Sequence, residues 1–223
     1  MERENNKAHR IASFYKSDLN PEVVRLQKRV FEVLEIPLEQ ICFEDSHSEA
    51  IDRYLAQTDF DSVTLFDVDC IPLSKDVVEI AKNLIDDDTI YGNAQITTYL
   101  TPPFVTFPFV APSFISFTRN LYETSSEKSF YQTQYPYDSG FRTDVAEAFV
   151  KANLDRGKKM ILSYPIESRN YKWGFEGDHL YQAFKYGNGT RFDNNTYHEF
   201  EIRNGEEGFI DYARGFLESL GDI

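Results

Sequence analysis

The sequence has few of the residues that mark several common classes of protein. Only two of its 223 residues are cysteine, Cys42 and Cys70, which excludes a disulfide framework. We expect both to be reduced, partly buried thiols. No stretch approaches the ~20 apolar residues of a membrane span. The polar first ten residues do not resemble a signal peptide, so a cytoplasmic protein without a membrane span is expected.

Basic residues and phosphate-binding loops are also scarce. The chain has 23 Lys and Arg against 37 Asp and Glu, a formal net charge of −14. Binding of nucleic acid through its phosphates requires a basic surface, so no nucleic-acid partner is expected. Neither the G-x-G-x-x-G nor the G-K-[ST] pattern occurs, which argues against a Rossmann dehydrogenase and a P-loop NTPase.

The remaining composition is that of a globular protein. Apolar residues make up 41% of the chain and charged residues 27%, so a core can form without help from a disulfide or a metal. The chain contains no internal repeat, low-complexity tract or linker. We therefore predict a single domain over residues 1–223.

The first third of the chain predicts an α/β fold. Short apolar strands alternate with amphipathic helices, a pattern typical of a mostly parallel sheet covered by helices on both faces. The predicted strands are Arg10–Tyr15, Gln40–Phe43 and Ser62–Phe66. One helix is expected after the Asn20 cap and Pro21, and another from Ser46 or Ser48 to Gln57. Ligands bind such sheets at the carboxyl ends of the strands.

The rest of the chain continues this alternation less regularly. Further helices are predicted at Leu73–Ile85, Ser139–Gly157 (capped by Thr143 or Asp144), Asp178–Tyr186 and Glu207–Leu220. Further strands are predicted at Thr89–Tyr99, Ser113–Thr118, Met160–Tyr164 and, as strand or turn, Thr196–Ile202. The proline-rich segment Thr101–Pro112 is expected to be an irregular loop.

The strongest functional signal is the segment SVTLFDVDCIPLS. Its apolar strand delivers Asp67 and Asp69 to a carboxyl end, and residues two apart in an extended chain point to the same side. Two neighbouring carboxylates repel each other, and a hard divalent cation would relieve that repulsion. Asp59 and Asp61 have the same spacing but precede the strand, so a turn is expected there.

An apolar strand that ends in Asp-x-Asp after two βα units resembles the GT-A class of nucleotide-sugar glycosyltransferases. The resemblance depends on DVD at Asp67–Asp69, WGFEGDHL at Trp173–Leu180 and TYHEF at Thr196–Phe200. It implies a single GT-A-like domain. Residues 1–72 would form a Rossmann-like nucleotide-binding half, and residues 89–205 an acceptor half.

The resemblance implies a metal-dependent hexosyl- or pentosyltransferase. In that class the Asp-x-Asp motif binds Mn²⁺ or Mg²⁺ together with the donor diphosphate, and a late histidine often completes the metal site. Those metal-binding roles fall here to Asp69, Asp67 and His198. The donor would be a UDP- or GDP-sugar, and the acceptor a glycan or another hydroxyl compound.

The resemblance also assigns residues to the donor and acceptor. The exits of the first two strands would hold the nucleoside, through Ser13, Tyr15, Asp45 and His47, beside Asp67 and Asp69. Asp178 would be the general base of an inverting enzyme, with a helix N-cap as its structural alternative. Trp173, Glu176 and Asp138 would contact the acceptor, with core packing and a turn as their structural alternatives.

Two other functions stay open. Haloacid-dehalogenase-like phosphatases also begin with an apolar strand that ends in Asp-x-Asp. Their motif normally continues Gly-Thr-Leu close to the N-terminus, whereas here Cys70-Ile71-Pro72 follows two βα units. The other alternative is a non-catalytic module that binds a nucleotide sugar.

Overall fold

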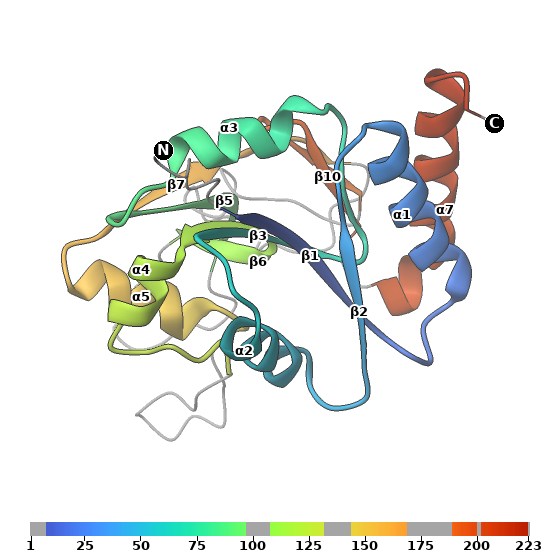
Figure 1. The fold of residues 1–223 in the computed structure, drawn as a ribbon. Helices are drawn as coiled ribbons and strands as arrows, with labels where there is room; N and C mark the ends of the chain where they lie inside the picture. The colour runs from blue at the N-terminus through green and yellow to red at the C-terminus, as the bar shows by residue number, and fades with distance from the viewer. Residues whose placement is uncertain (1–7, 97–107, 132–143, 169–188, 200–201, 223) are drawn as a thin grey trace, which may run out of the picture.

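A computed structural model describes residues 8–96, 108–131, 144–168, 189–199 and 202–222 (Figure 1). These residues form a mixed α/β domain in which helices flank a central sheet. The predicted helix Asp178–Tyr186 lies outside the described residues. No helix within those ranges combines the length and the apolar character that crossing a membrane requires.

The central sheet has six strands and is mostly parallel. Its strand order is β2-β1-β3-β6-β5-β7. The strands are β1 (His9–Lys16), β2 (Glu39–Phe43), β3 (Ser62–Asp67), β5 (Thr89–Ile96), β6 (Pro108–Thr118) and β7 (Lys159–Ser163). β1 pairs in parallel with β2 and β3, and β5 with β7, whereas β6 is antiparallel to both β3 and β5. The predicted parallel arrangement of the first three strands is confirmed.

Helices cover both faces of this sheet and one of its ends. They are α1 (Pro21–Val33), α2 (His47–Gln57), α3 (Asp76–Leu84), α4 (Arg119–Thr124), α5 (Glu147–Asp155) and α7 (Ile202–Ser219). In Figure 1, α3 lies on one side of the sheet, α2, α4 and α5 lie on the other, and α1 and α7 lie side by side. The hydrophobic core has three matching clusters, one beneath α2, α4 and α5, one beneath α3, and one between α1 and α7.

The two N-terminal helices begin where their caps predict. The Asn20 side chain accepts a hydrogen bond from the backbone of Glu22, and Pro21 is the first helical residue. Ser46 and Glu49 form a capping box at the start of α2. Because side-chain caps satisfy the free N–H groups of the first turn, these boundaries could be predicted from local sequence.

A second, smaller sheet was not predicted from the sequence, although its strand β10 lies within the strand or turn predicted at Thr196–Ile202. Its four short strands have the order β4-β10-β9-β8. They are β4 (Cys70–Pro72), β8 (Pro165–Ser168), β9 (Thr190–Phe192) and β10 (Thr196–His198). Strands of three or four residues are too short to show a hydrophobic period, and their partners are distant in sequence. The short helix α4 was missed for the same reason of length.

Several predicted boundaries are wrong. Pro108–Pro112 belongs to β6 and not to a loop: Pro108 is the first residue of the strand, and Pro112 lies opposite the register shift in β5, where a missing N–H is tolerated. The helix predicted to start near Thr143 or Asp144 begins at Glu147, because Ala146 has a left-handed φ of 68°. The last helix starts earlier than Glu207, at Ile202.

The two cysteines differ in environment more than the sequence predicts. Both are free thiols, as expected, and Cys70 is buried. Cys42 is exposed and not partly buried, because it lies on β2, the edge strand of the central sheet.

Candidate metal centre

The turn between β3 and β4 brings Asp67 and Asp69 together. Asp67 ends β3, the chain turns at Val68 and Asp69, and β4 begins at Cys70. The two carboxylates therefore converge across a turn, and the extended geometry assumed from the sequence is wrong. Buried Gln27 of α1 secures this turn, since its side-chain amide donates to the carbonyl oxygens of Asp67 (2.8 Å) and Cys70 (3.0 Å).

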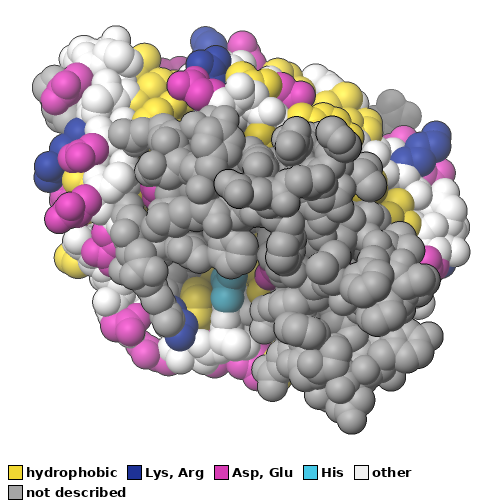
Figure 2. Space-filling model, turned by 180° about the vertical axis from the view of Figure 1, so that it is seen from behind, with side chains coloured by type: hydrophobic (Ala, Val, Ile, Leu, Met, Phe, Trp, Pro, Cys, Tyr) yellow, Lys and Arg dark blue, Asp and Glu magenta, His cyan; other side chains and the backbone are white. Residues whose placement is uncertain are grey.

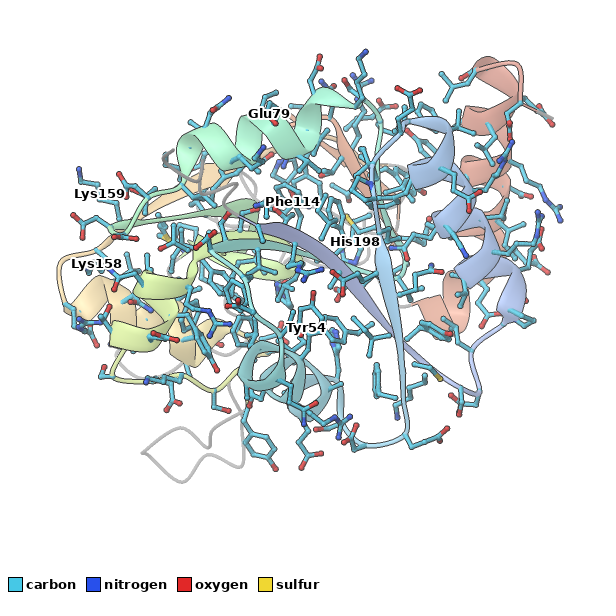
Figure 3. The ribbon with its side chains drawn as sticks, viewed as in Figure 1. Tyr54, Glu79, Phe114, Lys158, Lys159 and His198 are labelled. Carbon is cyan, nitrogen blue, oxygen red and sulfur yellow. The ribbon has the colours of Figure 1, made fainter. Side chains whose placement is uncertain are left out.

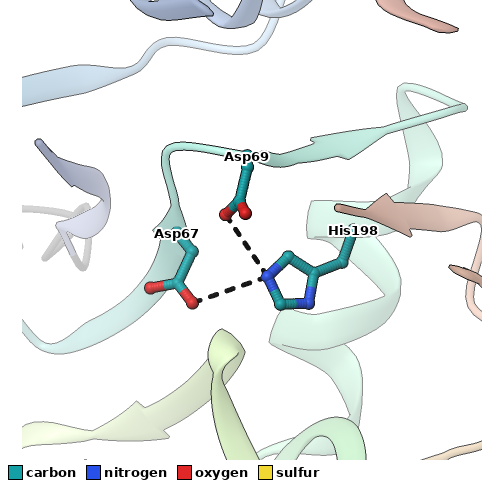
Figure 4. Close-up of side chains that lie close together, drawn as sticks. All are labelled: Asp67, Asp69 and His198. Atoms are coloured by element: carbon teal, nitrogen blue, oxygen red, sulfur yellow. Dashed lines mark ion pairs between the residues drawn. The ribbon is translucent and has the colours of Figure 1, made fainter. Parts of the chain in front are cut away.

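The second sheet carries His198 to the same place. β10 is antiparallel to β4, with His198 paired to Cys70, and the backbone N–H of Glu199 donates to the carbonyl oxygen of Asp69 at 3.0 Å. His198 Nε2 consequently lies 3.3 Å from Asp69 Oδ1 and 3.7 Å from Asp67 Oδ2 (Figure 4). Residues far apart in sequence thus form one compact cluster.

Burial sets the electrostatics of this cluster. Asp69 and His198 are buried, with exposures of 6% and 4%. Burial raises the pKa of Asp67, an effect that nearby His47 and His198 oppose and Asp69 reinforces. Burial would lower the pKa of His198, but the carboxylates of Asp69 and Asp67 outweigh it and raise that pKa. Each group thus depends on the others for charge compensation.

Asp67, Asp69 and His198 form a group that can hold a metal ion. Each offers one ligand atom, and these atoms lie within 4.8 Å of one another. Two carboxylate oxygens and one imidazole nitrogen are a donor set that suits divalent metals of hard or intermediate character. Oδ1 of Asp67 is buried and makes no hydrogen bond within the described part of the chain, although Nε2 of His47 lies 3.5 Å from it.

The cluster opens onto a cavity of about 420 Å³. The cavity lies at the carboxyl ends of β1, β2 and β3, the edge at which the sequence predicts ligand binding. It is lined by Phe14, Tyr15, Lys16, Asp18, Leu19, Phe43, His47, Asp67, Val68, Asp69 and Glu206. Acidic groups and aromatic rings dominate this lining, and Lys16 is its one Lys or Arg among the described residues.

Four of the six predicted donor-binding residues line this cavity: Tyr15, His47, Asp67 and Asp69. Ser13 is fully buried within β1 and Asp45 forms an ion pair with Arg53, and neither is part of the lining. The structure therefore brings together the predicted metal ligands and part of the predicted nucleoside site.

The residues predicted for the acceptor side are not described. Asp138, Trp173, Glu176 and Asp178 all lie outside the described residues. Their assignment to acceptor binding and to general-base catalysis stays a prediction.

Sequence reasoning missed two acidic residues of the lining, Asp18 and Glu206. Asp18 follows the β1 exit closely, and its proximity to Tyr15 and Lys16 was a usable signal. Glu206 comes from α7, which packs beside α1, and Asn20 donates a hydrogen bond to it at 3.1 Å. Nothing local in the sequence indicates that contact.

Acidic side chains outnumber basic ones on the face shown in Figure 2, in keeping with the net charge of the chain. Figure 3 shows Lys158 and Lys159 well away from His198, towards the opposite end of the sheet. These two basic side chains therefore cannot neutralise an anion bound at the cluster.

Comparisons with known proteins give little guidance. No protein-family model matches the chain, and no curated protein matches it. The solved structures that resemble this chain include the one described as "Crystal Structure of A197 from STIV", with 14% sequence identity and a TM-score of 0.35. The match covers 69% of this chain and 82% of that one. A similarity this distant supports no conclusion about function.

Proposed function

We propose that this protein is a metal-dependent glycosyltransferase of GT-A type, which moves a sugar from a nucleoside-diphosphate sugar to an acceptor hydroxyl. One observation carries the proposal: Asp67, Asp69 and His198 converge beside a cavity at the carboxyl edge of a mostly parallel sheet. The resemblance to Asp-x-Asp glycosyltransferases predicts a group of metal ligands at this edge of the sheet.

The donor set supports a hard divalent cation. Asp69, Asp67 and His198 would hold Mn²⁺ or Mg²⁺, which when bound neutralises the charge that develops on the leaving diphosphate. Imidazole suits first-row transition metals better than Mg²⁺, which prefers oxygen ligands, so of these two ions the histidine favours Mn²⁺.

The rest of the cavity supports a nucleotide as the group bound beside the metal. Tyr15 offers an aromatic ring, and flat rings suit stacking on a base. Lys16 places an ammonium group in the same lining, where it can contact a phosphate oxygen. Asp18 and Glu206 can accept hydrogen bonds from ribose hydroxyls or base N–H groups.

The acceptor side of the proposal depends on undescribed residues. Asp178 would take the proton from the attacking hydroxyl in an inverting transfer, and a retaining transfer would need no such base. Determination of the anomeric configuration of the product decides between these two outcomes.

Binding of nucleotides tests the proposal directly. Isothermal titration of the full chain with UDP, GDP, UDP-glucose, GDP-mannose and inorganic phosphate should be done with Mn²⁺ and with EDTA. We expect a nucleoside diphosphate or its sugar to bind with Mn²⁺ and to lose most affinity in EDTA. No nucleotide binding under any condition would contradict the proposal, and hydrolysis of a phosphate ester would instead support the phosphatase alternative.

A further inference from the structure

The two oxygens of the Asp67 carboxylate face different imidazoles. Oδ2 lies 3.7 Å from Nε2 of His198, on the side of the proposed metal ligands. Oδ1 lies 3.5 Å from Nε2 of His47, which is not part of the three-residue ligand group. Oδ1 is buried and has no hydrogen bond among the described residues, so His47 is the histidine that can satisfy it.

The ring of His47 is held in place by its neighbours. His47 is the first residue of α2, directly after the N-cap Ser46, which forms a capping box with Glu49. Its imidazole stacks on Phe43, with the ring centroids 5.8 Å apart and the planes 11° from parallel. It also lies against Phe14, at 6.1 Å.

These contacts hold His47 beside the strand that carries Asp67. Phe14 of β1 is the register partner of Asp67 of β3, so the imidazole packs on the residue beside the carboxylate. A ring fixed by packing on two strands, β1 and β2, and by the start of a helix presents Nε2 in one direction. That preorganisation is what an orienting group requires.

We propose that His47 is a positioning residue of the metal centre, which donates a hydrogen bond from Nε2 to Oδ1 of Asp67 and so directs Oδ2 towards Asp69 and His198. The inference rests on the proposed metal centre. A carboxylate ligand is itself oriented by hydrogen bonds from outside the ligand set. The contact of 3.5 Å is long for a hydrogen bond, and such contacts commonly shorten when a site is filled.

Orienting Asp67 differs from contacting the nucleotide-sugar donor, and an experiment can distinguish these two roles of His47. A residue that only touches the nucleotide has no effect on metal affinity measured without nucleotide. A residue that orients Asp67 changes that affinity even when no donor is present. The measurement is therefore the binding of Mn²⁺ without nucleotide. The full chain is titrated with Mn²⁺, and the electron paramagnetic resonance signal reports the concentration of free Mn²⁺.

Two substitutions separate the effect of the N–H group of His47 from the effect of its aromatic ring. His47→Phe keeps an aromatic ring on Phe43 and removes the N–H, whereas His47→Gln keeps an amide N–H at similar reach and removes the ring. We expect His47→Phe to weaken Mn²⁺ binding by about 10- to 100-fold, and His47→Gln to stay within a few fold of the unsubstituted protein. Equal Mn²⁺ affinity in His47→Phe and the unsubstituted protein would overturn the inference, as would a greater loss in His47→Gln than in His47→Phe.

Controls distinguish failure of this inference from failure of the metal centre. Asp69→Asn should abolish Mn²⁺ binding, and thermal unfolding without metal should show that each variant is folded. If His47→Phe does not fold, His47→Asn replaces it, since its amide is too short to reach Oδ1. Absence of Mn²⁺ binding in the unsubstituted protein would contradict the metal centre itself. Binding that Asp69→Asn abolishes and His47→Phe leaves intact would contradict only the positioning role.

Discussion

The side-chain amide of Gln27 donates a hydrogen bond to the backbone carbonyl of Asp67 at 2.8 Å. Gln27 is fully buried in α1 and makes a second bond, to the carbonyl of Cys70 at 3.0 Å. The side-chain carbonyl oxygen of Gln27 accepts a hydrogen bond from the side-chain amide of Gln40. A helix beside the sheet thus fixes the turn that presents the two carboxylates, so the shape of the metal centre depends on a residue outside it.

Replacement of Gln27 should therefore affect both stability and the metal centre. Gln27→Met keeps the length of the side chain but leaves two turn carbonyls without their donor, which should lower the free energy of unfolding by about 1–3 kcal/mol. Mn²⁺ affinity should fall as well, because the turn loses its anchor. Urea unfolding and Mn²⁺ titration measure the two effects. The exposed Gln57 supplies the control: Gln57→Met should change neither, and equal effects would refute the anchoring role.

The two pairs of aspartates should differ sharply. Asp69 is buried in the metal cluster, whereas Asp59 is exposed and precedes β3 at the other edge of the sheet. Asp69→Asn should abolish measurable Mn²⁺ binding, a loss of at least about 100-fold, because it removes a charged ligand and not merely an orienting group. Asp59→Asn should bind Mn²⁺ normally. A similar loss in both variants, measured by titration, would show that bound Mn²⁺ is held by general surface charge.

Local patterns predict part of this fold well. The apolar run from Ser62 to Phe66, followed directly by Asp67, indicated both the strand and the edge at which the carboxylates lie. The Asn20 cap indicated the first residue of α1, and Ser46, one of the two caps considered for α2, is the observed one. In each case the interactions that form the element connect residues close together in the sequence, so they can be predicted without knowledge of the fold.

The rest depends on pairing between distant segments. His198 could be assigned to the cluster only through a family resemblance. The strand that carries it is three residues long, which is too short to show an alternation of apolar and polar residues. Its position comes from pairing with β4, which the sequence does not indicate. Glu206 reaches the cavity only because α7 packs against α1.

The two cysteines should react at very different rates. Cys42 is exposed on the edge strand, and Cys70 is buried, where burial and the neighbouring carboxylates of Asp67 and Asp69 raise the pKa of its thiol well above the usual value. The thiolate is the reactive form. An aromatic disulfide reagent should therefore label about one thiol per native chain and two after unfolding in urea. Cys42→Ser should abolish the native reaction, and rapid labelling of that variant would contradict the burial of Cys70.

Gly92 is required by close packing within the central sheet. A Cβ atom at this position would lie 2.0 Å from the carbonyl oxygen of Phe114 and 2.5 Å from Cγ1 of Val110. Gly92→Ala should thus lower the free energy of unfolding by about 3 kcal/mol or more. Gly215 in α7 has nothing within 4 Å of such an atom, so Gly215→Ala should raise it by about 0.5–1 kcal/mol. Urea unfolding of both variants tests the contrast, and two changes of the same sign would contradict it.

His9 should make the protein less stable as the pH falls below neutrality. Its ring nitrogens lie 2.8 Å from Ser62 Oγ and 3.0 Å from Thr64 Oγ1. Burial, with a smaller effect from Lys82, lowers its pKa from 6.5 to about 4. Between these values the unfolded chain binds a proton that the native chain excludes, so the free energy of unfolding falls as the pH decreases from about 6.5 towards 4. Above that window both states are neutral and His9 adds no pH dependence.

Comparison with His9→Gln isolates this contribution from that of other titrating groups. Glutamine retains hydrogen-bonding capacity but does not titrate, so the variant should lose less stability than the unsubstituted protein when the pH is lowered. By linkage, the difference between the two proteins should change by on the order of 2 kcal/mol between about pH 7 and pH 5, in favour of His9→Gln. Urea unfolding at the two pH values gives all four free energies. An unchanged difference would mean that His9 accepts a proton in the native state as readily as in the unfolded chain, and that its burial beside Ser62 and Thr64 does not exclude the charge.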